Sequence, residues 1–466
     1  MITLPASLAP VLEAIRRVGR PRLVGGCVRD ALLGTTPGDL DIEVGGTDFD
    51  TLLAVLRPFG STDVVGRSFG TIKLRRNGTV YDFSLPRRES KTGTGHRGFK
   101  VEPDPLLSDA EAAARRDFTI NSMAWDPFDS QLIDPHGGQR DLQVRVLRHT
   151  SPAFGEDPLR VLRGMQLAAR FDLTLAPETR ELCRGIVASG RELPLERIWG
   201  EWDKLCLHAT TPSRGLHVLR ETGWTVLFPE IDALIDTPQE PEWHPEGDVF
   251  AHTCHCVDAL VGSAAWHHSP PDRRRILILA VLAHDFGKPL TTVRIEKHGT
   301  WRWTSPRHAS EGLAPTETFL ARIGAPLRLA PGILPLVKFH LAHIDGGADG
   351  LTDAQLRRLA RKLAPASIAD LVEVMRADAL GRPPLDGRAT EKLISGLAER
   401  AAQLAVQDRA PTPLVQGRDL VKRGLKPGPA FAPIIAAAYE AQLEGAFSDE
   451  QSSSIWLDDY LKHAPL

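Results

Sequence analysis

The stretch that decides the fold is LVGGCVRDALLG, from Leu23 to Gly34, together with GDLDIEV, from Gly38 to Val44. The period of two in a strand predicts that Asp39, Asp41 and Glu43 share one face, while the alternate residues point into a core. A row of carboxylates supplies the hard oxygen ligands that Mg²⁺ prefers. The pattern is typical of a nucleotidyl-transfer site, where two magnesium ions clamp the attacking hydroxyl and the leaving pyrophosphate.

A glycine turn lies just upstream of these carboxylates. Gly25 and Gly26 allow the backbone to approach a triphosphate closely. Arg29 offers a planar fork of donors to phosphate oxygens. A glycine pair or an Asp-x-Asp is common by itself, so the prediction depends on their conjunction in one short window.

A second polar strand follows the first. Two strand-like runs flank Asn77-Gly78, the strongest short-range signal for a hairpin. Alternation then places Asp82 on the polar face, opposite two aromatic neighbours. Asp82 is predicted to be the third metal carboxylate, and Glu43 is the alternative.

Composition limits the class of protein. The 466 residues are 42% hydrophobic and 25% charged, with a net charge of −3, which favours several globular domains and neither favours nor excludes nucleic acid. The five scattered cysteines predict reduced thiols rather than disulfides, and Cys254-His255-Cys256 alone does not make a zinc site. We expect no membrane segment, no secretion signal and a cytoplasmic location. A glycine-rich basic segment, 90–98, is either a cover for a nucleotide or RNA end or a solvated loop.

Helices dominate after a hinge near residue 137. Asp157-Pro158 begins the next helix, and its apolar stripe is predicted to be buried: Leu159, Leu162, Met165 and Ala169. Asp157 and Arg160, three residues apart, can present an acceptor and a forked donor to one partner. A cap with a surface ion pair is the simpler interpretation. Recognition of a nucleobase is the functional one.

A third group of reactive residues lies in the middle of the chain. An apolar helix over 276–283 ends in His284-Asp285, and both side chains can bind one metal ion. Other candidate ligands lie upstream and downstream of this pair: His252, His308, His340, His343 and Asp378.

The sequence resembles the bacterial tRNA CCA nucleotidyltransferase and poly(A) polymerase family. The motifs that carry the resemblance are LVGGCVRDALLG with GDLDIEV, RRDFTIN, DPHGG and EDPLRVLRGMQLAARF, over roughly residues 20–205. The segments WHPEGDVFAHT and LAHDFGKP are similar to an HD-type metal phosphohydrolase domain. Two departures are Gly38, where a basic residue is usual, and Gln166, where an arginine is usual.

The resemblance implies a role for each matched residue. Asp39 and Asp41 would be the catalytic metal-binding pair, and Asp157 and Arg160 would pair with the incoming cytosine or adenine. The remaining nucleotide-binding residues would be Gly25, Gly26, Arg29, Arg116, Asp117, Asn121 and Arg163. The implied ligands of a second divalent metal, of unknown identity, are His252, His284, Asp285 and Asp378.

The resemblance also implies an α+β fold. A mixed-sheet nucleotidyltransferase head of the DNA polymerase beta type (1–145) would precede a helical neck (146–235), an HD-type helical domain (240–385) and a helical tail that contacts tRNA (386–466). The implied activity is addition of C and A from CTP and ATP to the 3′ end of tRNA with Mg²⁺.

Other activities stay open at this point. Within the family, the alternatives are a CC-adding enzyme, an A-adding enzyme and a poly(A) polymerase. From another class, the HD-type phosphohydrolase is the main activity and the head only binds nucleotides.

Overall fold

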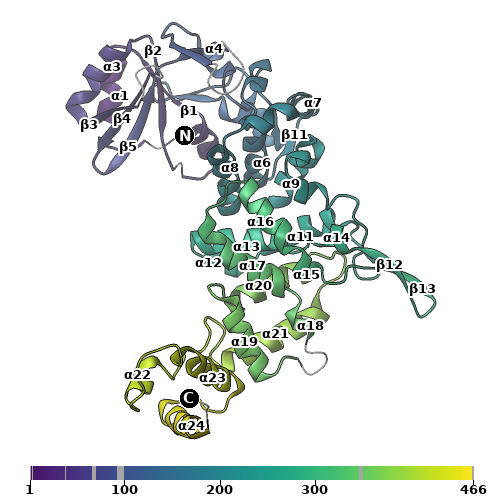
Figure 1. The fold of residues 1–466 in the computed structure, drawn as a ribbon. Helices are drawn as coiled ribbons and strands as arrows, with labels where there is room; N and C mark the ends of the chain where they lie inside the picture. The colour runs from purple at the N-terminus through teal and green to yellow at the C-terminus, as the bar shows by residue number, and fades with distance from the viewer. Residues whose placement is uncertain are drawn as a thin grey trace. The chain divides into compact units, whose positions relative to one another are not determined.

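The computed structural model describes Ile2 and residues 4–36, 38–65, 70–91, 99–345 and 350–463. The chain forms two compact units, Met1–Leu227 and Phe228–Leu466 (Figure 1). Within the described residues, no helix has both the length and the apolar character needed to cross a membrane. The basic segment predicted at 90–98 falls outside the described residues from position 92 onward.

A seven-stranded mixed sheet forms the centre of the first unit, with the strand order β3-β4-β5-β2-β1-β8-β9. Only β2 and β5 run parallel; the other neighbours are antiparallel. The strands are β1 (Arg20–Val24), β2 (Asp41–Gly45), β3 (Ser61–Val65), β4 (Thr71–Arg76), β5 (Thr79–Ser84), β8 (Ala124–Asp126) and β9 (Gln131–Ile133). The smaller pairs are β6 (Arg87–Lys91) with β7 (Phe99–Pro103), and β10 (Val146–Leu147) with β11 (Thr174–Leu175).

The predicted hairpin is confirmed. Asn77 and Gly78 both have positive φ, 51° and 80°, which suits the tight turn that joins β4 to β5. The expectation that Asp39 lies in the strand is wrong, because β2 begins at Asp41 and Asp39 precedes it in a bend. The alternation of side chains along the strand therefore does not determine the direction in which Asp39 points.

Helices surround this sheet and continue to the end of the first unit. Those before residue 150 are α1 (Ala9–Arg16), α2 (Gly26–Leu32), α3 (Phe49–Leu56), α4 (Asp109–Ala114), the 3₁₀ helix η3 (Thr119–Asn121) and α5 (Gly138–Gln143). Those after it are α6 (Leu159–Phe171), α7 (Pro177–Gly185), α8 (Leu195–His208) and α9 (Pro212–Glu221). The apolar stripe predicted for α6 is buried, and this helix packs against α8 and α9.

The second unit is almost wholly helical. Its longer helices are α11 (Val249–Val261), α13 (Pro271–Ala283), α16 (Leu313–Arg322), α17 (Ala330–Phe339), α19 (Asp353–Leu363), α20 (Ile368–Leu380), α21 (Arg388–Gln403), α23 (Phe431–Glu444) and α24 (Glu450–His463). Short helices are α10 (Pro229–Asp232), α12 (Ala264–His268), α14 (Lys288–Thr291), α15 (His308–Glu311), α18 (Ala342–Asp345) and α22 (Gly417–Val421). One hairpin, β12 (Val293–Lys297) with β13 (Thr300–Thr304), extends from these helices (Figure 1). The expected α+β class, a mixed-sheet head followed by helices, is confirmed.

Gly138 makes a close backbone contact that supports the nucleotide-binding region. A Cβ atom at this position would lie 2.1 Å from the carbonyl oxygen of Thr119, at the start of η3. We expect Gly138→Ala to lower the free energy of unfolding by about 1–3 kcal/mol, because backbone atoms must shift to admit the methyl group. Urea denaturation measures this change. The matched control is Gly200→Ala in α8, where nothing lies within 4 Å, and equal midpoints for the two variants would contradict the prediction.

Candidate active sites

Three carboxylates gather where β2 and β5 run side by side. Asp41 is directly opposite Asp82 in the parallel register, and Asp39 lies two residues before Asp41. Partial burial raises the pKa of Asp41; Arg116 opposes this shift, and the negative charges of Asp82 and Asp39 add to it. Carboxylates that raise one another's pKa are a suitable environment for a divalent cation, which would remove their repulsion.

The two candidates for the third carboxylate have different surroundings. Glu43 is only 7% exposed, and its Oε2 atom accepts from Arg115 at 2.9 Å and from Arg116 at 3.4 Å. In Asp82, Oδ2 accepts from Lys73 at 3.2 Å, but the buried Oδ1 has no hydrogen-bond partner among the described residues. Glu43 is thus neutralised within the protein, whereas Asp82 retains a free oxygen beside Asp41.

A pocket of about 470 Å³ lies beside Asp41. Three aspartates line it, and they are outnumbered by eight cationic side chains: Arg29, Arg87, Arg115, Arg116, Arg160, Arg163, Arg170 and Lys204. An excess of positive charge in a concave site attracts and orients a polyphosphate. The pocket also contains all nine residues predicted to contact the nucleotide: Gly25, Gly26, Arg29, Arg116, Asp117, Asn121, Asp157, Arg160 and Arg163.

The turn that precedes α2 requires glycine. Gly25 has φ +76°, in the region that L side chains rarely adopt, and a Cβ atom there would lie 3.0 Å from the guanidinium of Arg116. The close approach of backbone and arginine at the pocket wall is therefore built into the β1–α2 turn.

Arg29 makes more contacts within the protein than the sequence suggests. Its Nε and Nη2 atoms donate to Asp30 at 2.8 and 2.6 Å, and Nη1 donates to Asn121 at 2.5 Å. The guanidinium also lies over the ring of Phe171, 4.4 Å from its centroid. Arg29 therefore holds α2, η3 and α6 together at the pocket wall, besides adding positive charge there.

Asp117 forms the centre of a buried network in the pocket. Its Oδ2 atom lies 2.9 Å from Nε of Arg163, and Oδ1 accepts from the Asn121 amide at 3.1 Å and from the Phe118 N–H at 2.7 Å. Burial alone would raise the pKa of Asp117, but Arg163 and these hydrogen bonds hold it below its ordinary value. Asp117 remains ionised and fixes both neighbours in position.

Asp157 and Arg160 are held by other residues rather than by each other. Asp157 accepts from Arg197 of α8 at 2.8 Å and from the Leu159 N–H at 3.2 Å. Arg160 donates to the carbonyl oxygens of Ala153 at 3.0 Å and Arg115 at 2.7 Å. Carboxylate lone pairs and guanidinium N–H groups remain for a ligand. The sequence alone gave no sign of the role of Arg197, since it lies 40 residues from Asp157.

A second site lies at the end of α13, where His284-Asp285 meets His252 of α11 and Asp378 of α20. His252 Nε2 lies 3.1 Å from Asp378 and 3.7 Å from Asp285, and His284 Nε2 lies 3.2 Å from Asp285. All four are buried, and neither His284 Nε2 nor the oxygens of Asp285 have a well-aligned hydrogen bond within the described part of the chain. Buried nitrogen and oxygen atoms that lack a hydrogen-bond partner are suitable ligands for a divalent cation.

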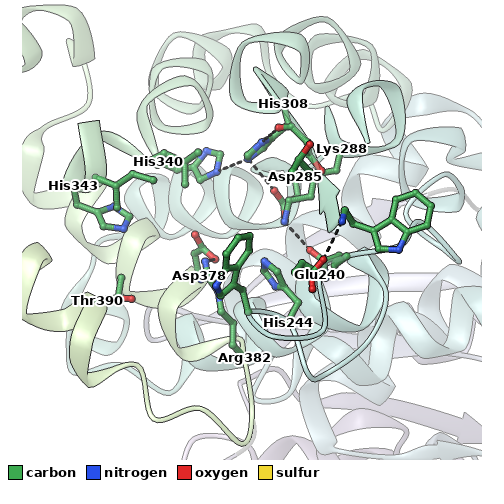
Figure 2. A pocket seen from close by; sticks show the side chains of 17 residues that line it. Glu240, His244, Asp285, Lys288, His308, His340, His343, Asp378, Arg382 and Thr390 are labelled. Atoms are coloured by element: carbon green, nitrogen blue, oxygen red, sulfur yellow. Dashed lines mark hydrogen bonds and ion pairs between the residues drawn. The ribbon is translucent and has the colours of Figure 1, made fainter. Parts of the chain in front are cut away.

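Cations accompany these ligands. Lys288 Nζ lies 2.7 Å from Asp285, and Arg382 donates to Asp378 at 2.6 Å. Burial alone would raise the pKa of Asp285, but His284 and Lys288 hold it well below its ordinary value. Asp285 and Asp378 line a pocket of about 350 Å³ together with Lys288 and Arg382, whereas His252 and His284 are not among its lining residues (Figure 2). Burial would also raise the pKa of Asp378, but Arg382 and His252 hold it well below its ordinary value. Both carboxylates are therefore ionised, the form that binds a metal.

The structure adds residues to this predicted set. Cys256, one helical turn after His252, places Sγ 3.3 Å from His252 Nε2, and the candidate ligand atoms of His252, Cys256, His284 and Asp378 lie within 4.8 Å of one another. Asp285, His308 and His340 form another such group. Of the Cys254–Cys256 run, only Cys256 belongs to a candidate metal-binding group among the described residues, and His284 and Asp378 of that group come from other segments of the chain.

Two further ligand candidates from the sequence, His340 and His343, lie in different surroundings. Burial, together with His284 and His308, lowers the pKa of His340 to about 3, so its ring is neutral at pH 7 and able to bind metal. His343 lines the pocket but belongs to none of the metal-binding groups found among the described residues, and Figure 2 shows it well to one side of Asp285.

Comparisons with known proteins identify a polymerase-type head in this chain and extend over most of its length. The family model "Poly A polymerase head domain" matches residues 21–148, and "Probable RNA and SrmB- binding site of polymerase A" matches residues 172–235. A "Multifunctional CCA protein" of Xanthomonas campestris pv. campestris (strain B100) is 36% identical over 441 residues, 92% of this chain and 99% of that relative. The protein of the same name from Xylella fastidiosa (strain M12) is 39% identical over 368 residues, 77% of this chain and 83% of that relative.

Solved structures of similar proteins share the fold. A CCA-adding enzyme of Bacillus stearothermophilus, solved in complex with CTP, has a TM-score of 0.66 and 22% identity, with 98% of both chains covered. The Thermotoga maritima CCA-adding enzyme, complexed with tRNA, has a TM-score of 0.62 and 20% identity, covering 99% of this chain and 97% of that one. Because the identity to the two curated relatives exceeds one third over most of its length, the chain belongs to the family of multifunctional CCA proteins.

Proposed function

We propose that this protein adds C and A from CTP and ATP to the 3′ end of tRNA and releases pyrophosphate. The observation that carries the proposal is the pairing of Asp41 with Asp82 at the edge of a cationic pocket that also contains Asp157 and Arg160. The curated relatives are named as multifunctional CCA proteins, and the solved neighbours include complexes with CTP, ATP and tRNA.

Nucleotidyltransferases of this kind use a divalent metal, typically Mg²⁺. We assign its ligands here to Asp39, Asp41 and Asp82, whose mutual repulsion and free Asp82 oxygen fit a cation. Mg²⁺ bound there would neutralise charge at the attacking hydroxyl and the leaving pyrophosphate.

The protein's own groups supply the remaining steps. Asp41, at the edge of the pocket, is assigned as the base that helps to activate the RNA 3′ hydroxyl. The arginines of the pocket bind the triphosphate and balance the charge that develops on it. The buried Asp117–Arg163–Asn121 network keeps the pocket wall in one arrangement, so that the phosphates do not have to reorganise it.

Choice of the base is assigned to Asp157 and Arg160. Arg160 donates and Asp157 accepts, which matches the Watson–Crick edges of cytosine and adenine after a small rotation, whereas uracil and guanine present the reverse pattern. Their position is set by Arg197, Ala153 and Arg115, so neither side chain has to be ordered when the nucleotide arrives.

Asp157→Ala is expected to reduce the preference for CTP over UTP by about 5- to 150-fold, because an unpaired buried polar group costs about 1–3 kcal/mol. Competition between labelled CTP and UTP for incorporation into tRNA measures this ratio. The matched control is Glu196→Ala, an exposed acid beside Arg197 on α8 that does not line the pocket. An unchanged ratio in Asp157→Ala would contradict the assignment.

Product length distinguishes full CCA addition from the family alternatives. With tRNA that lacks CCA, we expect three added nucleotides when CTP and ATP are both present and two with CTP alone. A CC-adding enzyme would stop at two, an A-adding enzyme would extend only tRNA ending in CC, and a poly(A) polymerase would exceed three with ATP alone. Any of these three results would replace the proposed function by the corresponding alternative.

We further infer that the second pocket is a metal-dependent phosphohydrolase site. Its support is the cluster of buried candidate ligands His252, His284, Asp285 and Asp378, in which His284 Nε2 and the Asp285 oxygens have no well-aligned hydrogen bond among the described residues. Lys288 and Arg382 line the same pocket and would attract a phosphate. We also propose that the chain consists of four domains, with the bounds 1–145, 146–235, 240–385 and 386–466.

A further inference from the structure

The β12–β13 hairpin presents an aromatic face. Trp301 and Trp303 lie two residues apart on β13, so their side chains share one side of the hairpin. Arg294, directly opposite Trp303 on β12, places its guanidinium carbon 6.0 Å from the ring of Trp301 and 5.9 Å from that of Trp303. Trp301 is 57% exposed, so its ring is accessible to a planar ligand.

This face is continuous with the second pocket. Trp303 lines the pocket together with Asp285, His308 and Asp378, while Trp301 is further out along the same strand. The backbone N–H of Trp303 donates to the Glu240 carboxylate at 3.0 Å, which fixes β13 at the pocket mouth. The aromatic surface therefore begins at the pocket with Trp303 and continues along β13 with Trp301.

The aromatic face of the hairpin carries one cation and one acid. Arg294 lies directly opposite Trp303 and Glu296 directly opposite Trp301, whereas Lys297 and Arg302 lie on the other side. Indole rings and a guanidinium stack well on nucleobases, and this stacking tolerates any base because every base has a π face. A ligand with a planar ring for the tryptophans and a phosphate for Lys288 and Arg382 is a nucleotide.

We propose that Trp301, Trp303 and Arg294 form a stacking platform for the base of a nucleotide whose phosphate enters the second pocket. This inference rests on the proposed phosphohydrolase function of that pocket. The platform would make the pocket prefer nucleotides over sugar phosphates without a base, and the nucleotide is either free or the 3′ end of an RNA.

Calorimetric titration of the full-length protein in EDTA tests binding without any hydrolysis. We expect Trp301→Ala to weaken AMP binding about tenfold or more, the loss typical of one stacked base. Trp301→Phe should retain most of the affinity, and Thr300→Ala, a neighbouring position on the opposite side of β13, should retain all of it. Ribose 5-phosphate, which has no base, should bind equally to all four proteins.

The outcomes separate the platform from the chemistry. Equal AMP affinity in the wild-type protein and Trp301→Ala would overturn the platform, as would equal affinity of the wild type for AMP and ribose 5-phosphate. A loss in Trp301→Ala without any measurable phosphohydrolysis would support the platform and contradict only the proposed reaction. A short RNA with a 3′ phosphate gives the second arm: a greater loss with this RNA than with AMP identifies an RNA end as the ligand.

Discussion

Asp41→Ala is expected to lower the rate of CMP incorporation into tRNA by at least about 10³-fold. Asp41 lies opposite Asp82 and beside the cationic pocket, so its loss removes a ligand of the proposed Mg²⁺ and the proposed base. Metal stabilisation of the developing charge amounts to several kcal/mol, and each 1.36 kcal/mol is a factor of about ten in rate. Single-turnover incorporation of labelled CMP measures the effect directly.

The controls for Asp41→Ala use the same protein. Asp39→Ala should show a similar loss, whereas Asp63→Ala, an exposed acid on β3 of the same sheet, should not. Hydrolysis of phosphoesters at the second pocket should stay at the wild-type rate in all three. Incorporation within tenfold of wild type in Asp41→Ala would show that the catalytic carboxylates lie elsewhere.

Asp285→Ala is expected to abolish metal binding at the second pocket and to reduce phosphoester hydrolysis by at least about 100-fold. The Asp285 oxygens are buried with no well-aligned hydrogen bond among the described residues, and His284, Lys288 and His308 all lie close to them. Even the loss of a group that only orients a ligand costs 10- to 100-fold in metal affinity, so removal of a ligand should cost more. Calorimetry with Ni²⁺, Zn²⁺ and Mg²⁺ gives a readout independent of activity.

Incorporation of CMP should be unchanged in Asp285→Ala, because Asp285 is not part of the head pocket. Thr390→Ala is the matched control, since Thr390 lines the second pocket but lies away from Asp285 (Figure 2). If Asp285→Ala retained both metal affinity and hydrolysis, the HD-type assignment would be wrong.

Local patterns in the sequence were sufficient to predict several elements. Asn77-Gly78 predicted the β4–β5 hairpin, because few residues other than Asn and Gly tolerate positive φ in such a turn. The apolar stripe predicted the buried face of α6, and the apolar run before His284-Asp285 predicted the end of α13. In each case the information lies within about one turn or one strand of the chain.

Contacts between segments far apart in the sequence were harder to predict. Asp39 was expected in the strand, yet it precedes β2, and alternation could not choose between Glu43 and Asp82. The choice became apparent from two facts that spacing does not contain: the parallel register of β2 with β5, and the ion pairs of Glu43 with Arg115 and Arg116. Likewise, Arg197 is connected to Asp157 only by the packing of α8 against α6.

A crystal structure of the protein soaked with Mn²⁺ and CTP would test the central claim most directly. Anomalous scattering should place Mn²⁺ at the carboxylates of Asp39, Asp41 and Asp82, with the triphosphate among the arginines of the head pocket and the cytosine edge at Asp157 and Arg160. Mn²⁺ and CTP bound only at the second pocket, or a head pocket that holds the nucleotide while its carboxylates bind no metal, would contradict the account.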